Sequence, residues 1–287
     1  MMKEENQLTL LIRGIIYNRT AFIGLGITII VISLLIFAPF VIKDPNKPDF
    51  GNLLQPPNLK ALFGTDGLGR NVLTRILYGG RISLFISIIS ISLSSMMGVL
   101  IGLVSGYSGS RTDSIIMRGI DVLMAFPDFV LALVLTTSIG FGMVGMIIAI
   151  AIAYTPNFAR LARGGVLSVK EQEFVEAARS IGVSNLKIMF SEILPNCIAP
   201  IIVQATIGMG FVIIMEAGLS FLGIGIQSPN LSWGSILAEG REYMAVAPWI
   251  VTLDGIIITI TVLGINLLGD GLRDTLDPKL KTEIKSI

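Results

Sequence analysis

The chain has 287 residues, of which 53% are hydrophobic and 14% charged, and its mean hydropathy is +0.80. So large an apolar fraction lies outside the range of soluble globular domains and predicts a multi-span membrane protein. The net charge of +1, the single cysteine and the lack of histidine argue against three features: a nucleic-acid partner, an intrachain disulfide framework, and imidazole-based metal or hydrolytic chemistry.

Six apolar runs are long enough to cross a bilayer, which takes about 20 residues of helix. The first follows a polar N-terminal tail and is longer than a signal-peptide core, so we expect it to be retained as a transmembrane helix. The fourth is short and reaches full length only if it continues to residue 161. The sequence therefore predicts an all-α integral membrane protein with six transmembrane helices. The runs comprise residues 21–42, 82–106, 115–139, 143–154, 198–215 and 249–268.

The distribution of Lys and Arg sets the expected orientation. With six spans both termini lie on one side, and that side holds 14 of the 21 basic residues. Because cytoplasmic loops are enriched in Lys and Arg, we expect both termini in the cytoplasm. The first outer loop, residues 43–81, nevertheless carries 6 of the 7 basic residues on the opposite side, which indicates a structured element rather than a plain connection.

This first outer loop begins with four prolines and continues as GTDGLGRNVLTRILYGGRISL. Its glycines do not form the GxxxxGK[ST] phosphate loop, and the rest of the chain lacks that pattern too, so we do not expect the chain to bind a nucleotide. An apolar stripe accompanies Arg70 and Arg75 and predicts an amphipathic helix at the outer membrane interface. The stripe consists of Val72, Leu73, Ile76 and Leu77.

The second and third spans contain small and charged residues with two different expected roles. Gly98, Gly102 and Gly106 recur at a spacing of four and predict close helix packing. Asp121 lies three residues after Arg118, so an intrahelical ion pair is expected, with a gating role as the alternative.

Acidic residues near the later spans are costly unless they pair, face water or end a helix. Asp128 follows Pro127 and is expected either to cap a proline kink or to line a pathway. Glu216 ends the fifth span at the outer face, where it either reaches interfacial water or faces the route of a substrate. Asp254 lies close to Trp249, so an interfacial position is expected.

Residues 218–246 on the outer side are too apolar for a free loop and too interrupted by Gly and Pro for a span. A re-entrant or surface-lying gate and a packed outer cap both fit this pattern, and the packed cap is slightly favoured. The gate would need protein or water around its backbone polar groups.

The polar segment between the fourth and fifth spans reads EAARSIGVSNLKIMFSEILPN. Its alanines favour a helix, Glu176 and Arg179 are spaced to pair on the helix surface, and Gly182 allows the helix to end. A second short helix is expected from Ser184, with Pro195 ending it. The sequence thus predicts a helix–turn–helix knob at the membrane surface, whose apolar face and charged edges suit docking into a groove of another protein.

The spacing within this segment is more specific than a lone EAA tripeptide, because a glycine and an ILP triplet follow at set distances between two spans. The segment resembles the EAA loop of permease subunits in bacterial binding-protein-dependent ABC importers. Further strings are similar to the dipeptide, oligopeptide and nickel importer group, in the partner subunit with a long first external loop. They are GTDGLGR…LTR…GGRISL, DSIIMRGIDVLMAFP, EAGLSFLGIGIQSPNLSWG and NLLGDGLRDTLDPK. The resemblance covers nearly the whole chain and departs from the group at Asn71 and Ser228.

This resemblance implies the fold of a type I ABC importer permease, with six transmembrane helices and a cytoplasmic coupling helix. It divides the chain into an N-terminal region of tail, first span and external loop (1–81), a transmembrane domain (82–275) with the EAA loop at 159–196, and a cytoplasmic tail (276–287). The chain itself would be no enzyme and hold no cofactor, since ATP and Mg would be bound by two separate ATPase subunits.

Other partners implied by the resemblance are a homologous second permease, an external substrate-binding protein and the lipid of a bacterial inner membrane; nucleic acid is not expected. The EAA loop would couple the chain to the ATPase subunits. Most of the candidates for a substrate pathway or gate are acidic residues in the spans. The coupling residues are Glu176, Ala177, Ala178, Arg179, Gly182, Ile193, Leu194 and Pro195. The pathway or gate candidates are Asp121, Asp128, Glu216 and Ser220.

Short peptides are the expected cargo because they are the commonest cargo of the group, with nickel or a metal chelate as the alternative. The lack of histidine weakens direct metal coordination by this chain. A secondary transporter with its own ion site would belong to another class and predicts inverted repeats and broken spans. No internal repeat is visible, and such a carrier would not need the knob. A membrane scaffold without transport is a further alternative, and the direction of transport rests on the resemblance alone.

Overall fold

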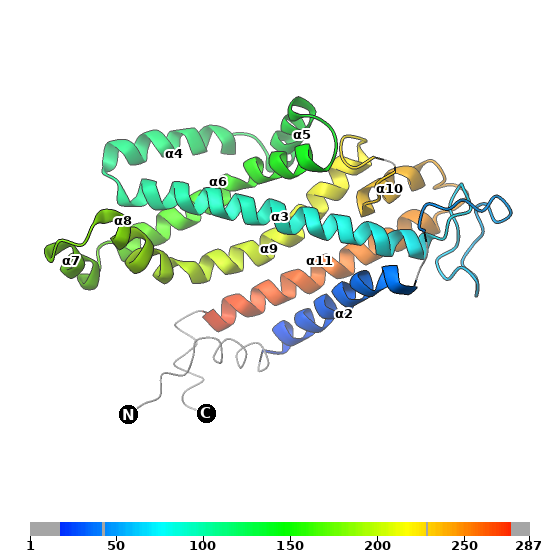
Figure 1. Cartoon of the computed structure of the whole chain (residues 1–287), viewed down its shortest axis with the longest axis horizontal. Coiled ribbons are helices and arrows are strands. Elements are labelled where there is room, and N and C mark those ends of the chain that lie inside the picture. The colour runs from blue at the N-terminus through cyan, green and yellow to red at the C-terminus, as the bar shows by residue number, and fades with distance from the viewer. Residues whose placement is uncertain (1–17, 42–43, 228, 277–287) are drawn as a thin grey trace.

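The computed structural model describes residues 18–41, 44–227 and 229–276. The predicted tails at both ends of the chain lie largely outside these ranges. Within them the regular structure is helical, and one isolated β-bridge joins Thr65 to Asn71. Most of the helices lie along the longest axis of the molecule (Figure 1). They are α2 (Arg19–Val41), α3 (Val72–Tyr107), α4 (Ser110–Met124), α6 (Met143–Val169), α9 (Leu194–Phe221) and α11 (Trp249–Leu276). The short helix α5 (Asp128–Ile139) is turned away from this direction.

The shorter elements gather at the two ends of this bundle (Figure 1). One end, here called the loop end, carries residues 44–71 and α10 (Trp233–Arg241). The opposite end, the knob end, carries the knob, which we define as residues 173–193. The knob contains α7 (Glu173–Ser180), α8 (Asn185–Lys187) and the π-helical turn η1 (Ile188–Ile193).

Five of the described helices are long and apolar enough to cross a membrane, and the number is six if the bent pair α4 and α5 forms one span. The predicted third span is therefore not one straight helix, because α4 and α5 are bent by 88° at the break between them. Pro127 explains the break, since it lacks a backbone N–H and disfavours helical geometry at the residue before it. When the bent pair is counted as one span, successive spans run in opposite directions between the loop end and the knob end (Figure 1).

The second span starts earlier than the sequence suggested. The apolar stripe at its start forms the first turns of the 36-residue α3 and not a separate interfacial helix, because Val72 and Ile76 are buried against the rest of the bundle. Asn71 caps the helix by accepting a hydrogen bond from the Thr74 backbone N–H at 3.2 Å. At a rise of 1.5 Å per residue, α3 extends about 54 Å from the loop end to the knob end.

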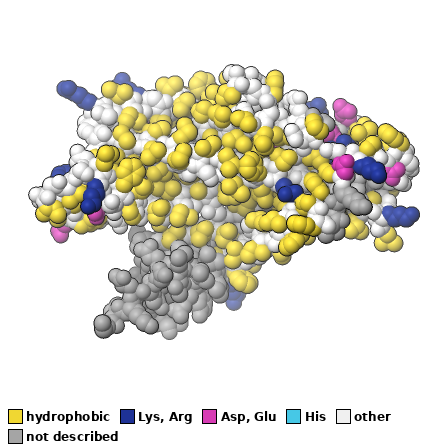
Figure 2. Space-filling view, viewed as in Figure 1, with side chains coloured by type: hydrophobic (Ala, Val, Ile, Leu, Met, Phe, Trp, Pro, Cys, Tyr) yellow, Lys and Arg dark blue, Asp and Glu magenta, His cyan; other side chains and the backbone are white. Residues whose placement is uncertain are grey.

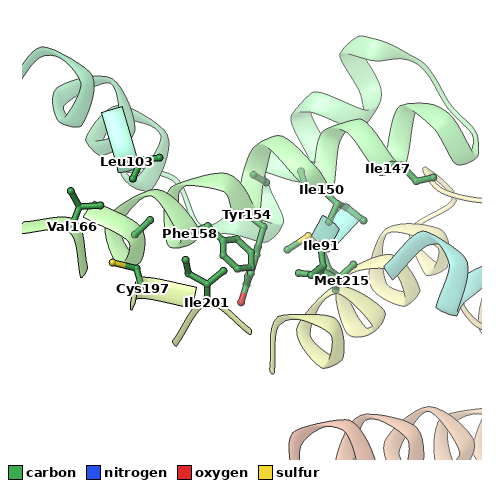
Figure 3. Packing of buried hydrophobic residues seen from close by; sticks show 14 of the residues in the cluster. Ile91, Leu103, Ile147, Ile150, Tyr154, Phe158, Val166, Cys197, Ile201 and Met215 are labelled. Atoms are coloured by element: carbon green, nitrogen blue, oxygen red, sulfur yellow. The ribbon is translucent and has the colours of Figure 1, made fainter. Parts of the chain in front are cut away.

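Close packing of α3 on α6 confirms the role expected for the small residues. A Cβ added at Gly98 would lie 2.5 Å from the Phe158 Cβ, and one at Gly102 would lie 2.5 Å from the Ala159 carbonyl oxygen. The main apolar core forms around this contact and includes α9, with Tyr154 beside Phe158 in an edge-to-face arrangement (Figure 3). The two helices can approach so closely only because glycine has no side chain.

An ion-pair network orders the basic first outer loop, as its charge pattern predicted. The Arg75 guanidinium, 1% exposed as a residue, contacts the Asp66 carboxylate at 2.6 Å and the Glu239 carboxylate at 2.8 Å. Arg70 contacts the same two acids at 2.7 and 2.6 Å. Because Glu239 belongs to α10, the network joins residues 44–71 to the loop-end helix.

Residues 231–240 form a packed cap, which confirms the favoured alternative over a surface-lying gate for this part of the segment. Trp233 is fully buried, and its indole N–H donates to the Ile76 carbonyl oxygen of α3 at 3.0 Å. Ser232 caps α10 by accepting a hydrogen bond from the Ser235 N–H. On the face drawn in Figure 2, hydrophobic side chains cover the middle, and charged side chains lie mostly toward the two ends. This pattern fits a bilayer around the middle of the bundle.

Candidate functional site

The knob has the turn that its glycine predicted. Gly182 adopts a φ of +79°, a left-handed conformation that residues with a Cβ disfavour. Its N–H donates to the Arg179 carbonyl oxygen, and the Val183 N–H donates to the Ala178 carbonyl oxygen, both at 3.1 Å. This is the Schellman arrangement, which satisfies the last carbonyls of α7 and turns the chain into α8.

One face of the knob packs on the bundle. Val175, Ile188 and Ile193 are fully buried, and Ala178 is partly buried against the same core. The other face is exposed and includes Glu176. Of the predicted coupling residues, Ala177, Arg179, Gly182 and Pro195 are also exposed, whereas Leu194 is partly buried.

The exposed face carries apolar side chains as well as charges. Ile181 is 81% exposed and Leu186 is 69% exposed, and both lie beside the turn at Gly182. Phe174 and Phe190 are also exposed. Apolar side chains presented next to charged edges are typical of a surface that docks into a groove on another protein.

The contact that holds the knob differs from the one predicted. Glu176 forms no ion pair with Arg179 among the described residues; the Arg179 guanidinium instead lies 5.8 Å from the centre of the Tyr107 ring. The Tyr107 hydroxyl donates to the Asn185 side-chain oxygen at 2.8 Å. Tyr107 is the last residue of α3, so both short helices of the knob rest on the end of that helix.

A lysine at the end of α6, three residues before the knob, forms a further link to the end of α3. The Lys170 ammonium donates to the Gly106 carbonyl oxygen at 3.0 Å, which satisfies a carbonyl at the C-terminus of α3. Sequence reasoning missed Tyr107 because no local pattern marks an aromatic residue that meets a partner 78 residues away.

Pro195 does not end the second helix of the knob, contrary to the expectation. The chain continues without a break from α8 through η1 into α9, where Pro195 is the second residue. The N–H of Leu194 bonds to the Met189 carbonyl oxygen, five residues earlier, as in a π-helix. The wider π-helical turn accommodates Pro195, which has no backbone N–H to donate. The helix therefore continues, and the knob is directly continuous with the fifth span.

The first two pathway candidates contact α6. The Asp121 carboxylate accepts a hydrogen bond from the Arg160 guanidinium at 2.6 Å and not from Arg118, which corrects the predicted pair. Asp128, the first residue of α5, accepts a hydrogen bond from the Asn157 side-chain amide at 3.2 Å. Both carboxylates therefore hold the bent pair of helices against α6.

The other two candidates, Glu216 and Ser220, lie together in the interior and not at an interface. The Glu216 carboxylate is fully buried and accepts hydrogen bonds from the Ser83 hydroxyl at 2.7 Å and the Ser220 hydroxyl at 2.8 Å. Asp254 is fully buried too, and neither of its carboxylate oxygens has a hydrogen-bond partner. The interfacial position predicted for Asp254 is therefore wrong, and so is the first of the two alternatives for Glu216, contact with interfacial water, because the loop-end cap covers this part of the bundle.

The four pathway candidates therefore do not form one site. Two bind α6 from the bent pair, and two belong to a buried hydrogen-bonded cluster. Among the described residues, no group of three or more Cys, Asp or Glu side chains is arranged to hold a metal ion. The arrangement supports mechanical linkage between helices: one long helix, α3, joins the loop-end network to an exposed knob.

These features define a multi-span membrane protein with an exposed helical knob between two of its spans. The chain belongs to the family of binding-protein-dependent transport system inner membrane components, whose model matches residues 98–282.

The chain is also similar over most of its length to curated transport permeases. It is 44% identical to a putative peptide transport system permease protein of Brucella suis biovar 1 (strain 1330), covering 94% of this chain and 92% of the relative. It is 42% identical to the di/tripeptide transport system permease protein DppC of Pseudomonas aeruginosa (strain UCBPP-PA14), covering 92% and 90%.

A solved structure confirms the predicted fold. The inward-facing MetNI methionine ABC transporter aligns with a TM-score of 0.59 at 17% identity, covering 72% of this chain and 97% of the aligned chain. The chain therefore has the type I fold of ABC importer permeases.

Proposed function

We propose that this chain is the transmembrane permease subunit of an ATP-driven importer of short peptides and forms half of the translocation pathway. The observation that carries the proposal is the exposed apolar tip of the knob at Ile181 and Leu186, held on the end of α3 by Tyr107. Family membership supports the transport role, since a chain of this family is a component of a binding-protein-dependent system.

The knob is the proposed contact with an ATPase subunit. Glu176 and Arg179 form its charged edge, and Gly182 sets its bend. When the ATPase subunits close on ATP, the knob shifts and carries with it the end of α3 through Tyr107. The knob is also continuous with α9, so two spans move together and rock the pathway from inward-open to outward-open.

The proposed complex contains a homologous second permease, two ATP-binding subunits and an external substrate-binding protein. ATP and Mg are bound by the ATP-binding subunits, and this chain has no catalytic role of its own. The knob end and both termini face the cytoplasm of a bacterial cell, and the loop end faces the external binding protein. The excess of Lys and Arg on the side of the termini supports this orientation.

Short peptides are the proposed cargo, in preference to nickel or a metal chelate. The support comes from the relatives, whose names specify peptides, dipeptides or tripeptides at 42–44% identity over nearly the whole chain.

Uptake of a radiolabelled dipeptide by cells that express the chain with its genomic partners tests this function. We expect uptake in the wild type and its loss in Glu176→Lys, with less ATPase subunit co-purifying. The matched control is Glu242→Lys, the same substitution at an exposed position of the loop end, where the ATPase should stay bound. Normal uptake and normal ATPase binding in Glu176→Lys would contradict the coupling role, and lack of dipeptide uptake in the wild type would contradict the cargo.

A further inference from the structure

A cavity of about 450 Å³ lies at the loop end, between the start of α3, the start of α6 and the segment that precedes α10. Its polar lining comes from Tyr78, Arg81 and Asn230, and its apolar lining includes Phe85, Met143 and Ile226. The volume falls within the range of about 300–1,000 Å³ typical of sites for small molecules.

Arg81 gives this cavity its charge. Arg70 and Arg75, which precede Arg81 in the sequence, form ion pairs with Asp66 and Glu239. Arg81 is exposed and forms no ion pair among the described residues, and no Asp or Glu lines the cavity. The guanidinium is therefore available to an anionic ligand, for which its planar fork of donors is well suited.

The apolar side of the cavity is built for a side chain. Phe85 on α3 and Met143 on α6 are 49% and 38% exposed and belong to the same lining. The cavity thus places a cationic group beside an apolar wall. The C-terminus of a peptide carries the complementary pair of groups, because its carboxylate and its last side chain are attached to the same Cα.

The back wall is fixed by the buried cluster around Glu216. The Ile226 N–H donates to the Ser220 hydroxyl oxygen at 3.1 Å, and that hydroxyl donates to Glu216. Ser83, which also donates to Glu216, lies two residues after Arg81 on α3. The carboxylate of Glu216 therefore fixes the position of Ile226 relative to the start of α3, which carries Arg81. Glu216 and Ser220 thus act as positioning residues for the cavity.

We propose that this cavity binds the C-terminal carboxylate of a short peptide through Arg81, with the Phe85–Met143 wall receiving the last side chain. The proposal rests on the proposed function, because it names a subsite for the peptide that the importer would carry. An anionic phospholipid head group shares the same chemistry, and the experiment below separates the two sources.

The test compares a radiolabelled dipeptide with the same dipeptide carrying a C-terminal amide. The full complex is reconstituted in proteoliposomes, and uptake is measured at limiting peptide for the wild type and Arg81→Gln. We expect Arg81→Gln to lower uptake of the free dipeptide roughly tenfold and to leave uptake of the amide unchanged, since one charge-assisted contact is lost. The binding protein is common to every sample, so its own preference cancels when the acid-to-amide ratios are compared.

Two further variants sharpen this test. Arg111→Gln removes an exposed arginine at the knob end and should match the wild type. Arg81→Lys keeps the charge without the fork of donors and should give an intermediate ratio.

Three outcomes would overturn the proposal. The first is an unchanged acid-to-amide ratio in Arg81→Gln. The second is an equal loss for acid and amide that appears only when the liposomes contain anionic phosphatidylglycerol, which would assign the cavity to a lipid head group. The third is the absence of dipeptide uptake by the wild-type complex, which would remove the proposed function and this subsite together.

Discussion

Replacement of Gly182 by alanine tests the geometry of the knob. With φ at +79°, a residue with a Cβ costs about 1–2 kcal/mol at this position, and no atom lies within 4 Å of the added Cβ to contribute a clash. The cost therefore falls on the turn alone. Since about 1.4 kcal/mol corresponds to a factor of ten in an equilibrium, we expect the turn to open about tenfold more often while the bundle stays folded.

Hydrogen–deuterium exchange measures this opening at the amides of residues 182 and 183, which donate to the last carbonyls of α7. Gly164→Ala is the matched control, because Gly164 is exposed on α6 and has no atom within 4 Å and no left-handed φ. That control should stabilise its helix by about 0.5–1 kcal/mol. Equal protection of the two amides in Gly182→Ala and the wild type would refute the assignment of strain to this turn.

Three further substitutions test the packing, the ion-pair network and the knob anchor. Gly102→Ala should destabilise the protein by about 1–3 kcal/mol in thermal unfolding because its Cβ would meet backbone of α6, whereas Gly119→Ala, with open space around it, should not. Asp66→Ala should cost about 3 kcal/mol, since it removes a partner of the buried Arg75; an unchanged unfolding temperature would contradict this. Tyr107→Phe loses one hydrogen bond of about 1 kcal/mol and should reduce peptide imported per ATP hydrolysed, and Tyr107→Ala should reduce it further; normal coupling in both would disprove the anchor.

The length and hydropathy of the apolar runs predicted most of the spans, because a helix that crosses a bilayer must be both long enough and apolar. The first span, α2, and the start of the last span, α11, match apolar runs read from the sequence, and the knob follows from local chemistry at its alanines and Gly182. Boundaries were less accurate where a buried helix continues past its apolar run. The extra turns at the start of α3 are buried by the loop-end cap, which no local pattern in that stretch reveals.

The partners of the polar side chains could not be predicted in the same way. Asp121 meets Arg160 at a separation of 39 residues, and Glu216 meets Ser83 at a separation of 133. Periodicity tells which face of a helix is apolar but not which other helix covers it. Glu216 was therefore expected at the outer face, in contact with interfacial water or with the route of a substrate, although the fold places it in the interior with two serine donors.

Photo-crosslinking from the knob tests the central claim most directly. A photoreactive amino acid is placed at Ile181, which is 81% exposed at the knob end, or at Leu59, which is 98% exposed at the loop end. In cells that still import the dipeptide, we expect the position-181 variant to crosslink to an ATP-binding subunit and the position-59 variant not to do so. Crosslinking of the ATP-binding subunit from position 59 but not from position 181 would contradict both the docking site and the orientation of the chain.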